Sequence, residues 1–278
     1  MTVKAFNDFK EFENEAEKLG VEEDLRALLT LDANFMERYK NYVVVNLKDY
    51  GPEPNNLMVL SYETALLYST KQLGERDFSL FRFTIKKKFG ESTVLALLVM
   101  RKVLESYNRR FEELNAEIDK LEAQPVIEQL ESVARYLRKL TDRVEDFIEV
   151  LIKLEERRIR EVNTQYVSYD WDILTTEAQH LLDRCRRRLS LITGLRSEMD
   201  IHSTLELNKR IEVLTDIMKK LTSITVILMI PNVVGSHFGM NFKFMPELSV
   251  DWAYPAVIII QIALAVGAAL YFRKKGWL

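Results

Sequence analysis

Hydrophobic and polar positions change their spacing along the chain. Within residues 1–90 we predict a polar helix at 7–19 and strands at 42–47, 57–62 and 78–85, the last from its alternation of aromatic and polar residues. A Gly-Pro-Glu-Pro-Asn-Asn segment that starts at Gly51 separates the strands. We therefore expect a small α/β cytoplasmic unit at residues 1–90.

From Glu91 onward, apolar residues recur every three or four positions. This coiled-coil seam runs over 107–121 and resumes after Pro125, which predicts a long antiparallel helical hairpin that turns near the proline. A third long helix is predicted to begin between Asp172 and Thr175, both suitable N-caps. A helix over 175–238 would be roughly 95 Å long. Residues 91–220 are thus expected to form the hairpin and a stalk.

The C-terminal residues contain two uncharged apolar segments, 221–238 and 254–272. Each is close to the roughly 20 residues that span the hydrocarbon core of a bilayer. Lysines precede the first segment and the basic residues of 273–278 follow the second, whereas the connector 239–253 is nearly free of them. We therefore predict a multi-pass protein of the plasma or inner membrane, with both termini cytoplasmic and the connector outside.

The first apolar segment carries polar residues at membrane depth, where exposure to lipid is costly. Helical spacing places several of them on one stripe with apolar residues, and we propose that this stripe lines a pore. It is called the pore face below: Thr215, Met218, Leu221, Thr225, Met229, Asn232 and Ser236. The alternative is that Thr222, Ser223 and Ser236 join helices to one another. One lining helix per chain requires several copies in a ring.

Composition and isolated residues exclude other classes of function. A formal net charge of −3 with a pI of about 5.8 argues against a nucleic-acid partner. The single cysteine, Cys185, fits a reducing compartment. His180, His202 and His237 are scattered, and we find no nucleophile triad, phosphate loop or paired-histidine motif. We expect neither an enzyme nor an organic cofactor.

The end of the first apolar segment carries a recognisable motif. It reads Gly239-Met240-Asn241, followed by Phe242 and then Met-Pro-Glu-Leu from Met245. The context includes Leu221-Thr222, Pro231, Trp252, Tyr254-Pro255 and the closing Arg-Lys-Lys-Gly-Trp-Leu. Over 208–278 the chain resembles the CorA family of Mg2+ channels, and upstream it resembles that family in layout.

The resemblance implies an α+β membrane protein that assembles as a homopentamer. It assigns the selectivity filter to Gly239, Met240 and Asn241, with Asn241 binding hydrated Mg2+ through its water shell, and the narrow apolar part of the pore to Met218, Leu221 and Met229. It also implies regulatory Mg2+ at acidic sites between protomers, for which Asp172, Asp183 and Asp200 are candidates. Thr215 stands where relatives often have asparagine.

Acidic residues of the connector fit the same chemistry. Mg2+ releases its waters reluctantly, so a ring of neutral oxygens can select the hydrated ion, whereas carboxylates in the pore would hold it too tightly. The pore face has no Asp or Glu, while Glu247 and Asp251 lie in the outer connector, where they raise the local cation concentration.

Three alternatives remain open at this point. The chain could transport Zn2+, Co2+ or Ni2+ on the same fold, since neutral oxygens do not identify one divalent ion. It could also be a membrane-anchored coiled-coil scaffold. The Gly-Met-Asn triplet could in addition be a plain helix stop, with Gly239 or Asn241 in the left-handed C-cap conformation.

Overall fold

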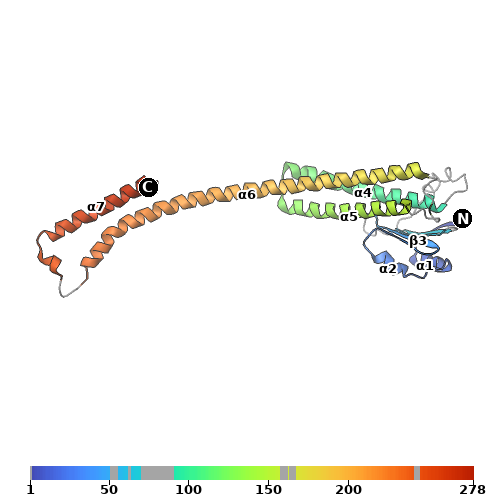
Figure 1. Ribbon diagram of the computed structural model, residues 1–278, viewed down its shortest axis with the longest axis horizontal. Coiled ribbons are helices and arrows are strands. Elements are labelled where there is room, and N and C mark those ends of the chain that lie inside the picture. Colours follow the sequence, from blue (N-terminus) through green and yellow to red (C-terminus); the bar gives the residue numbers. More distant parts are fainter. Residues whose placement is uncertain are drawn as a thin grey trace. The chain divides into compact units, whose positions relative to one another are not determined.

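The structure is a computed structural model that describes residues 2–50, 56–61, 64–69, 91–156, 162, 167–240 and 245–278 (Figure 1). The chain separates into two compact units, Met1–Ser197 and Glu198–Leu278. The N-terminal α/β part, the long helices and an apolar C-terminal helix confirm the predicted fold class. The predicted strand at 78–85 lies outside the described residues.

A five-stranded sheet forms the centre of the N-terminal α/β part. Its order is β1-β5-β4-β3-β2, with β1 and β5 parallel and every other pair antiparallel. The strands are β1 (Thr2–Phe6), β2 (Phe35–Arg38), β3 (Tyr42–Leu47), β4 (Asn56–Ser61) and β5 (Thr64–Ser69). The predictions at 42–47 and 57–62 correspond to β3 and β4, whereas β1, β2 and β5 were not predicted.

Helices cover both faces of this sheet. On one face, α1 (Phe9–Lys18) and α2 (Leu25–Thr30) contribute Phe12, Ala16 and Leu25 to a core shared with Val44 and Val59 (Figure 1). On the other face, α4 (Glu91–Ala123) packs against the β1, β4 and β5 strands, and α5 (Ile127–Glu156) packs against β2. All six residues of β3 are consequently buried. Burial on both faces explains why apolar and polar residues do not alternate along this strand.

The predicted helical hairpin is confirmed as α4 and α5, which are joined by a short turn that contains Pro125. Helix α6 (Ser168–Phe238) begins earlier than predicted, so Asp172 and Thr175 lie inside it and are not N-caps. Burial of Val167, Trp171 and Leu174 extends the apolar pattern toward the N-terminus and explains the difference. Helix α6 ends at Phe238, as predicted, and continues through Pro231.

A buried polar network ties the sheet to the hairpin. The Tyr107 hydroxyl of α4 donates to the carbonyl of Lys48 and accepts from the Asn34 amide nitrogen, which is 2.9 Å away. The same amide nitrogen donates to the Arg143 carbonyl of α5 at 2.8 Å, and the Lys48 amide donates to the Asn34 side-chain oxygen at 2.7 Å. Since Asn34 and Tyr107 are buried, these partners replace the water that the groups lose on folding.

Tyr107→Phe is expected to lower the free energy of unfolding by about 1–2 kcal/mol, because it leaves the buried Lys48 carbonyl without its hydroxyl donor. Chemical denaturation of the purified protein measures the change. Tyr136→Phe is the matched control, since Tyr136 is 47% exposed and should tolerate the loss of its hydroxyl. Equal stability of the two variants would contradict a structural role for the network.

Candidate ion-conduction site

The predicted membrane segments both lie in the second unit. Helix α7 (Ala253–Lys274) contains the predicted span 254–272, and within the part of the chain that the structure describes it is the one helix that is long and apolar enough to cross a membrane. The predicted first span, 221–238, forms the C-terminal part of α6. Its six polar residues, including Asn232 and Ser236, make this segment less apolar than α7.

One face of α6 is covered and contains Ser223. The Ser223 side chain is fully buried, and its hydroxyl lies 2.8 Å from the Lys220 carbonyl and 3.4 Å from the Trp277 carbonyl at the end of the chain. Helical spacing continues this face through half-buried residues at intervals of four and three: Ile227, Ile230, Val234 and Phe238. The chain end that follows α7 therefore lies on this side of α6.

The end of α7 is shaped to make this contact. Gly276 has a positive φ of 72°, and the amide of Trp277 donates to the Phe272 carbonyl at 2.9 Å, a hydrogen bond typical of a helix that ends at a left-handed glycine. The Trp277 ring thereby stacks on the Phe272 ring with centroids 5.6 Å apart. The sequence analysis did not predict the contact between the Trp277 carbonyl and Ser223, for which Gly276 is the available signal.

The pore face lies on the opposite side of α6. Nine residues separate Ser223 from Asn232, which corresponds to roughly 180° around the helix axis. All seven residues of the pore face are exposed in the single chain, and Met218, Leu221 and Met229 are exposed by 66%, 63% and 58%. The seven residues thus lie exposed along α6, away from the side that carries Ser223.

Gly239 and Met240 follow directly after α6, whereas Asn241 lies outside the described residues. The Gly239 amide donates to the Gly235 carbonyl at 3.0 Å, and the Met240 amide donates to the His237 carbonyl at 3.4 Å. Gly239 does not adopt the left-handed conformation that was one alternative for it, since the positive-φ glycines of the described chain are Gly20 and Gly276. A Cβ atom at Gly239 would lie 3.3 Å from the Gly235 carbonyl oxygen, so the close approach itself favours glycine.

The acidic candidates are dispersed. Glu247 lies in the 3-10 helix η2 (Pro246–Ser249), Asp251 is exposed beside it, and Asp172, Asp183 and Asp200 are exposed along α6. The described ranges contain no group of three or more His, Cys, Asp or Glu side chains that could hold a metal ion within one chain. Cys185 is buried, and this burial raises the pKa of its thiol to about 12.

Comparison with known proteins agrees with this architecture. Residues 15–274 match the family model of the CorA-like Mg2+ transporter protein. The cobalt/magnesium transport protein CorA of Thermotoga maritima is 28% identical over 264 residues, which cover 87% of this chain and 72% of that protein. The magnesium transport protein CorA of Escherichia coli strain K12 is 42% identical over 62 residues, which cover 22% of this chain and only 20% of that protein.

Solved structures share the fold. The complete structure of the CorA magnesium transporter from Methanocaldococcus jannaschii matches with a TM-score of 0.54 at 19% identity, over 99% of this chain and 90% of that one. The full-length CmaX protein matches with a TM-score of 0.58 at 12% identity, over 98% and 87%. The family model covers nearly all of the sequence and the fold agrees along the chain, so the protein belongs to the CorA-like Mg2+ transporter family.

Proposed function

We propose that this chain is one protomer of a homopentameric membrane channel that passes hydrated divalent cations, with Mg2+ as the principal ion. The observation that carries the proposal is the exposed pore face of α6, which combines amide, hydroxyl and thioether groups on the side away from Ser223. A face of this kind is unfavourable against lipid and favourable around water. Several copies in a ring would enclose it.

The chemistry of the pore face suits an ion that keeps its water shell. Asn232, Thr225 and Ser236 offer neutral oxygens, and the Thr225 hydroxyl keeps a free lone pair while it donates to the Leu221 carbonyl at 2.8 Å. Such groups accept hydrogen bonds from metal-bound water without replacing it. Met218, Leu221 and Met229 would form the apolar constriction, which can stop conduction by expelling water.

The outer end of α6 supplies the filter. In this proposal Asn241 contacts the hydrated ion, the carbonyls of Gly239 and Met240 line the mouth, and Glu247 and Asp251 concentrate cations outside. The spans are 221–238 and 254–272, and both termini are cytoplasmic. Cytoplasmic Mg2+ would act as regulatory ligand through the α6 stalk. The family consists of transporters, which agrees with the prediction that the chain is not an enzyme.

Cobalt is the second candidate ion. The Thermotoga maritima relative is named a cobalt/magnesium transport protein, and it aligns with most of this chain. Co2+ and Mg2+ both form octahedral hydrates, and outer-sphere recognition by neutral oxygens separates such ions weakly. We therefore expect Co2+ to pass through the same pore.

Ion flux into proteoliposomes tests the proposal. The full-length protein is reconstituted, and uptake of Mg2+, Co2+, Ni2+ and Zn2+ is compared at equal gradients with protein-free vesicles. We expect Mg2+ uptake to exceed uptake by the empty vesicles, with Co2+ uptake detectable. An absence of flux for all four ions by an assembled oligomer, or a strictly monomeric protein in lipid, would overturn the proposal.

A further inference from the structure

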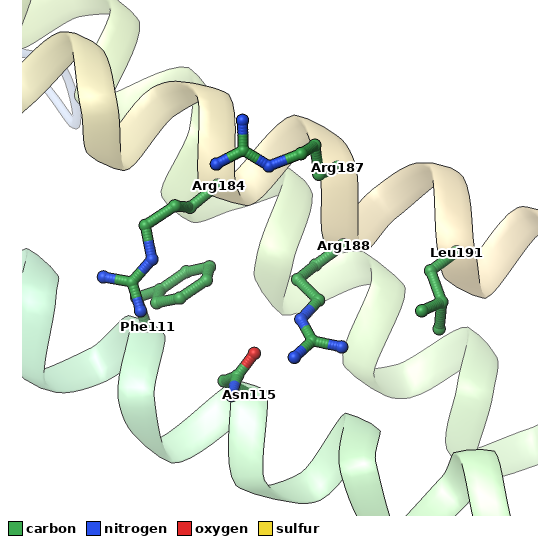
Figure 2. A pocket seen from close by; sticks show the side chains of 6 residues that line it. All are labelled: Phe111, Asn115, Arg184, Arg187, Arg188 and Leu191. Carbon is green, nitrogen blue, oxygen red and sulfur yellow. The ribbon is translucent and has the colours of Figure 1, made fainter.

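A basic groove lies between α4 and α6 in the first unit, far along the sequence from the pore face. It encloses about 380 Å3 and is lined by three arginines of α6 together with residues of α4 (Figure 2). The complete lining is Phe111, Asn115, Arg184, Arg187, Arg188 and Leu191, called the arginine groove below. We propose that the arginine groove binds a compact polyanion with a phosphoanhydride chain, the chemistry of inorganic tripolyphosphate and of the triphosphate tail of a nucleotide.

The packing of α6 explains why three arginines meet in one place. Trp171, Leu174, Ala178, Leu181 and Cys185 are buried and fix which face of α6 turns toward the hairpin. Arg184, Arg187 and Arg188 then lie on the flank beside α4. Arg186, one position away, lies on the other flank and pairs with Glu145 of α5 at 2.7 Å. The three arginines therefore meet beside α4 because α6 is packed against the hairpin in this orientation.

The charges of the arginine groove leave a positive excess. Arg184 pairs with Glu112 at 2.6 Å and Arg188 pairs with Asp119 at 3.1 Å. Both carboxylates belong to α4 and are more than half exposed, so these pairs contribute little stability and can separate at low cost. Arg187 has no carboxylate partner among the residues that the structure describes.

Guanidinium groups recognise phosphate oxygens through two parallel N–H donors, with more geometric specificity than an ammonium group. In Figure 2, Arg184 and Arg188 extend from α6 toward α4, and Arg187 stays at the α6 side. An anion with several phosphates offers more oxygens over a greater length than a single phosphate does, so it can contact more than one of these groups at once. The groove therefore favours a chain of phosphates over orthophosphate.

Phe111 limits the ligand class further. Its side chain is 1% exposed, and the Arg184 guanidinium carbon lies 4.4 Å from the centre of its ring. The groove consequently offers no open aromatic face on which a nucleobase could stack. Recognition is restricted to the phosphate chain, and we expect tripolyphosphate and ATP to bind with similar affinity and AMP to bind far more weakly.

Binding of Mg2+ to a phosphate chain neutralises part of its charge, so the arginine groove should prefer the metal-free anion. Free polyphosphate becomes more abundant as free Mg2+ falls. The ligand would therefore report a low cytoplasmic Mg2+ level, and only this link to transport rests on the proposed function. Binding itself can be measured without any flux assay.

Isothermal titration calorimetry of the full-length protein in lipid nanodiscs tests the proposal, with tripolyphosphate, ATP and AMP as separate titrants in the presence of EDTA. We expect tripolyphosphate and ATP to bind, with affinities that fall as salt or Mg2+ is added. Arg187→Ala should weaken both by about tenfold, since it removes charged hydrogen bonds. Arg186→Ala is the matched control and should bind as the unmodified protein does.

Three outcomes would overturn the proposal. The first is tripolyphosphate binding that Arg187→Ala leaves unchanged. The second is ATP binding without tripolyphosphate binding, which would indicate recognition of the base. The third is an absence of tripolyphosphate and ATP binding by the unmodified protein. A changed oligomeric state in Arg187→Glu would in that case assign the groove to an acidic surface of a second copy. Normal ion flux in any of these cases would leave the proposed function intact, because binding and flux are measured separately.

Discussion

Asn241→Ala is expected to abolish Mg2+ uptake into proteoliposomes while the oligomer stays assembled. In the proposed channel every copy contributes one Asn241 amide to the outer mouth, so one substitution removes the whole ring of groups that contact the hydrated ion. Neutral carbonyls of Gly239 and Met240 remain, but they contact the ion without the side-chain amides. Uptake is followed with a Mg2+-sensitive dye trapped inside the vesicles.

Asn208→Ala is the matched control for this variant. Asn208 is an exposed asparagine of α6 that lies before both apolar segments. It should leave uptake unchanged. Chemical cross-linking of both variants in lipid reports their assembly, and unchanged uptake by an assembled Asn241→Ala protein would remove the filter from the proposal.

Asn232→Leu is expected to reduce Mg2+ uptake by about an order of magnitude relative to the unmodified channel. Ser223→Leu is expected to reduce uptake less. Asn232 lies on the exposed pore face, where leucine replaces an amide with an apolar group that expels water. Ser223 is buried on the opposite face, where its hydroxyl lies 3.4 Å from the Trp277 carbonyl. Its replacement should disturb the contact with the chain end and leave the pore face intact.

Thermal unfolding separates the two effects. Ser223→Leu should lower the unfolding temperature, because a larger side chain is forced into a filled position, whereas Asn232→Leu should not. Ser223→Ala provides a milder variant that removes the hydroxyl without overpacking. Equal losses of uptake in Asn232→Leu and Ser223→Ala would reject the assignment of the pore face.

Regular spacing made the helical part of the fold predictable. The hairpin of α4 and α5 follows from apolar residues at intervals of three and four. The end of α6 follows from the end of the uncharged apolar segment at Phe238. The β1 and β2 strands were missed because they are edge strands of five and four residues, which are too short to show a clear spacing of apolar positions. The predicted start of α6 was too late because Asp172 looks like an N-cap. Trp171 already belongs to the helix, and its side chain is buried.

The candidate site was predictable only in part. Helical spacing alone grouped Asn232 with the rest of the pore face, but it could not decide which polar residues α7 covers, so Ser223 stayed ambiguous. That decision depends on the position of Trp277, more than fifty residues away. The arginine groove was not predicted either, because charged residues on a long helix usually face solvent, and only the packing of α6 against the hairpin places these arginines beside α4.

Pro231 lies inside α6, seven residues before the helix ends. Proline has no amide hydrogen, so the carbonyl of Ile227 loses the donor that an α-helix would normally supply from that position. A missing rung in the hydrogen-bond ladder lowers the bending stiffness of the helix at one point. The last two turns, which carry Ser236 and lead to Gly239, are therefore attached to the rest of α6 through the point at which the helix bends most easily.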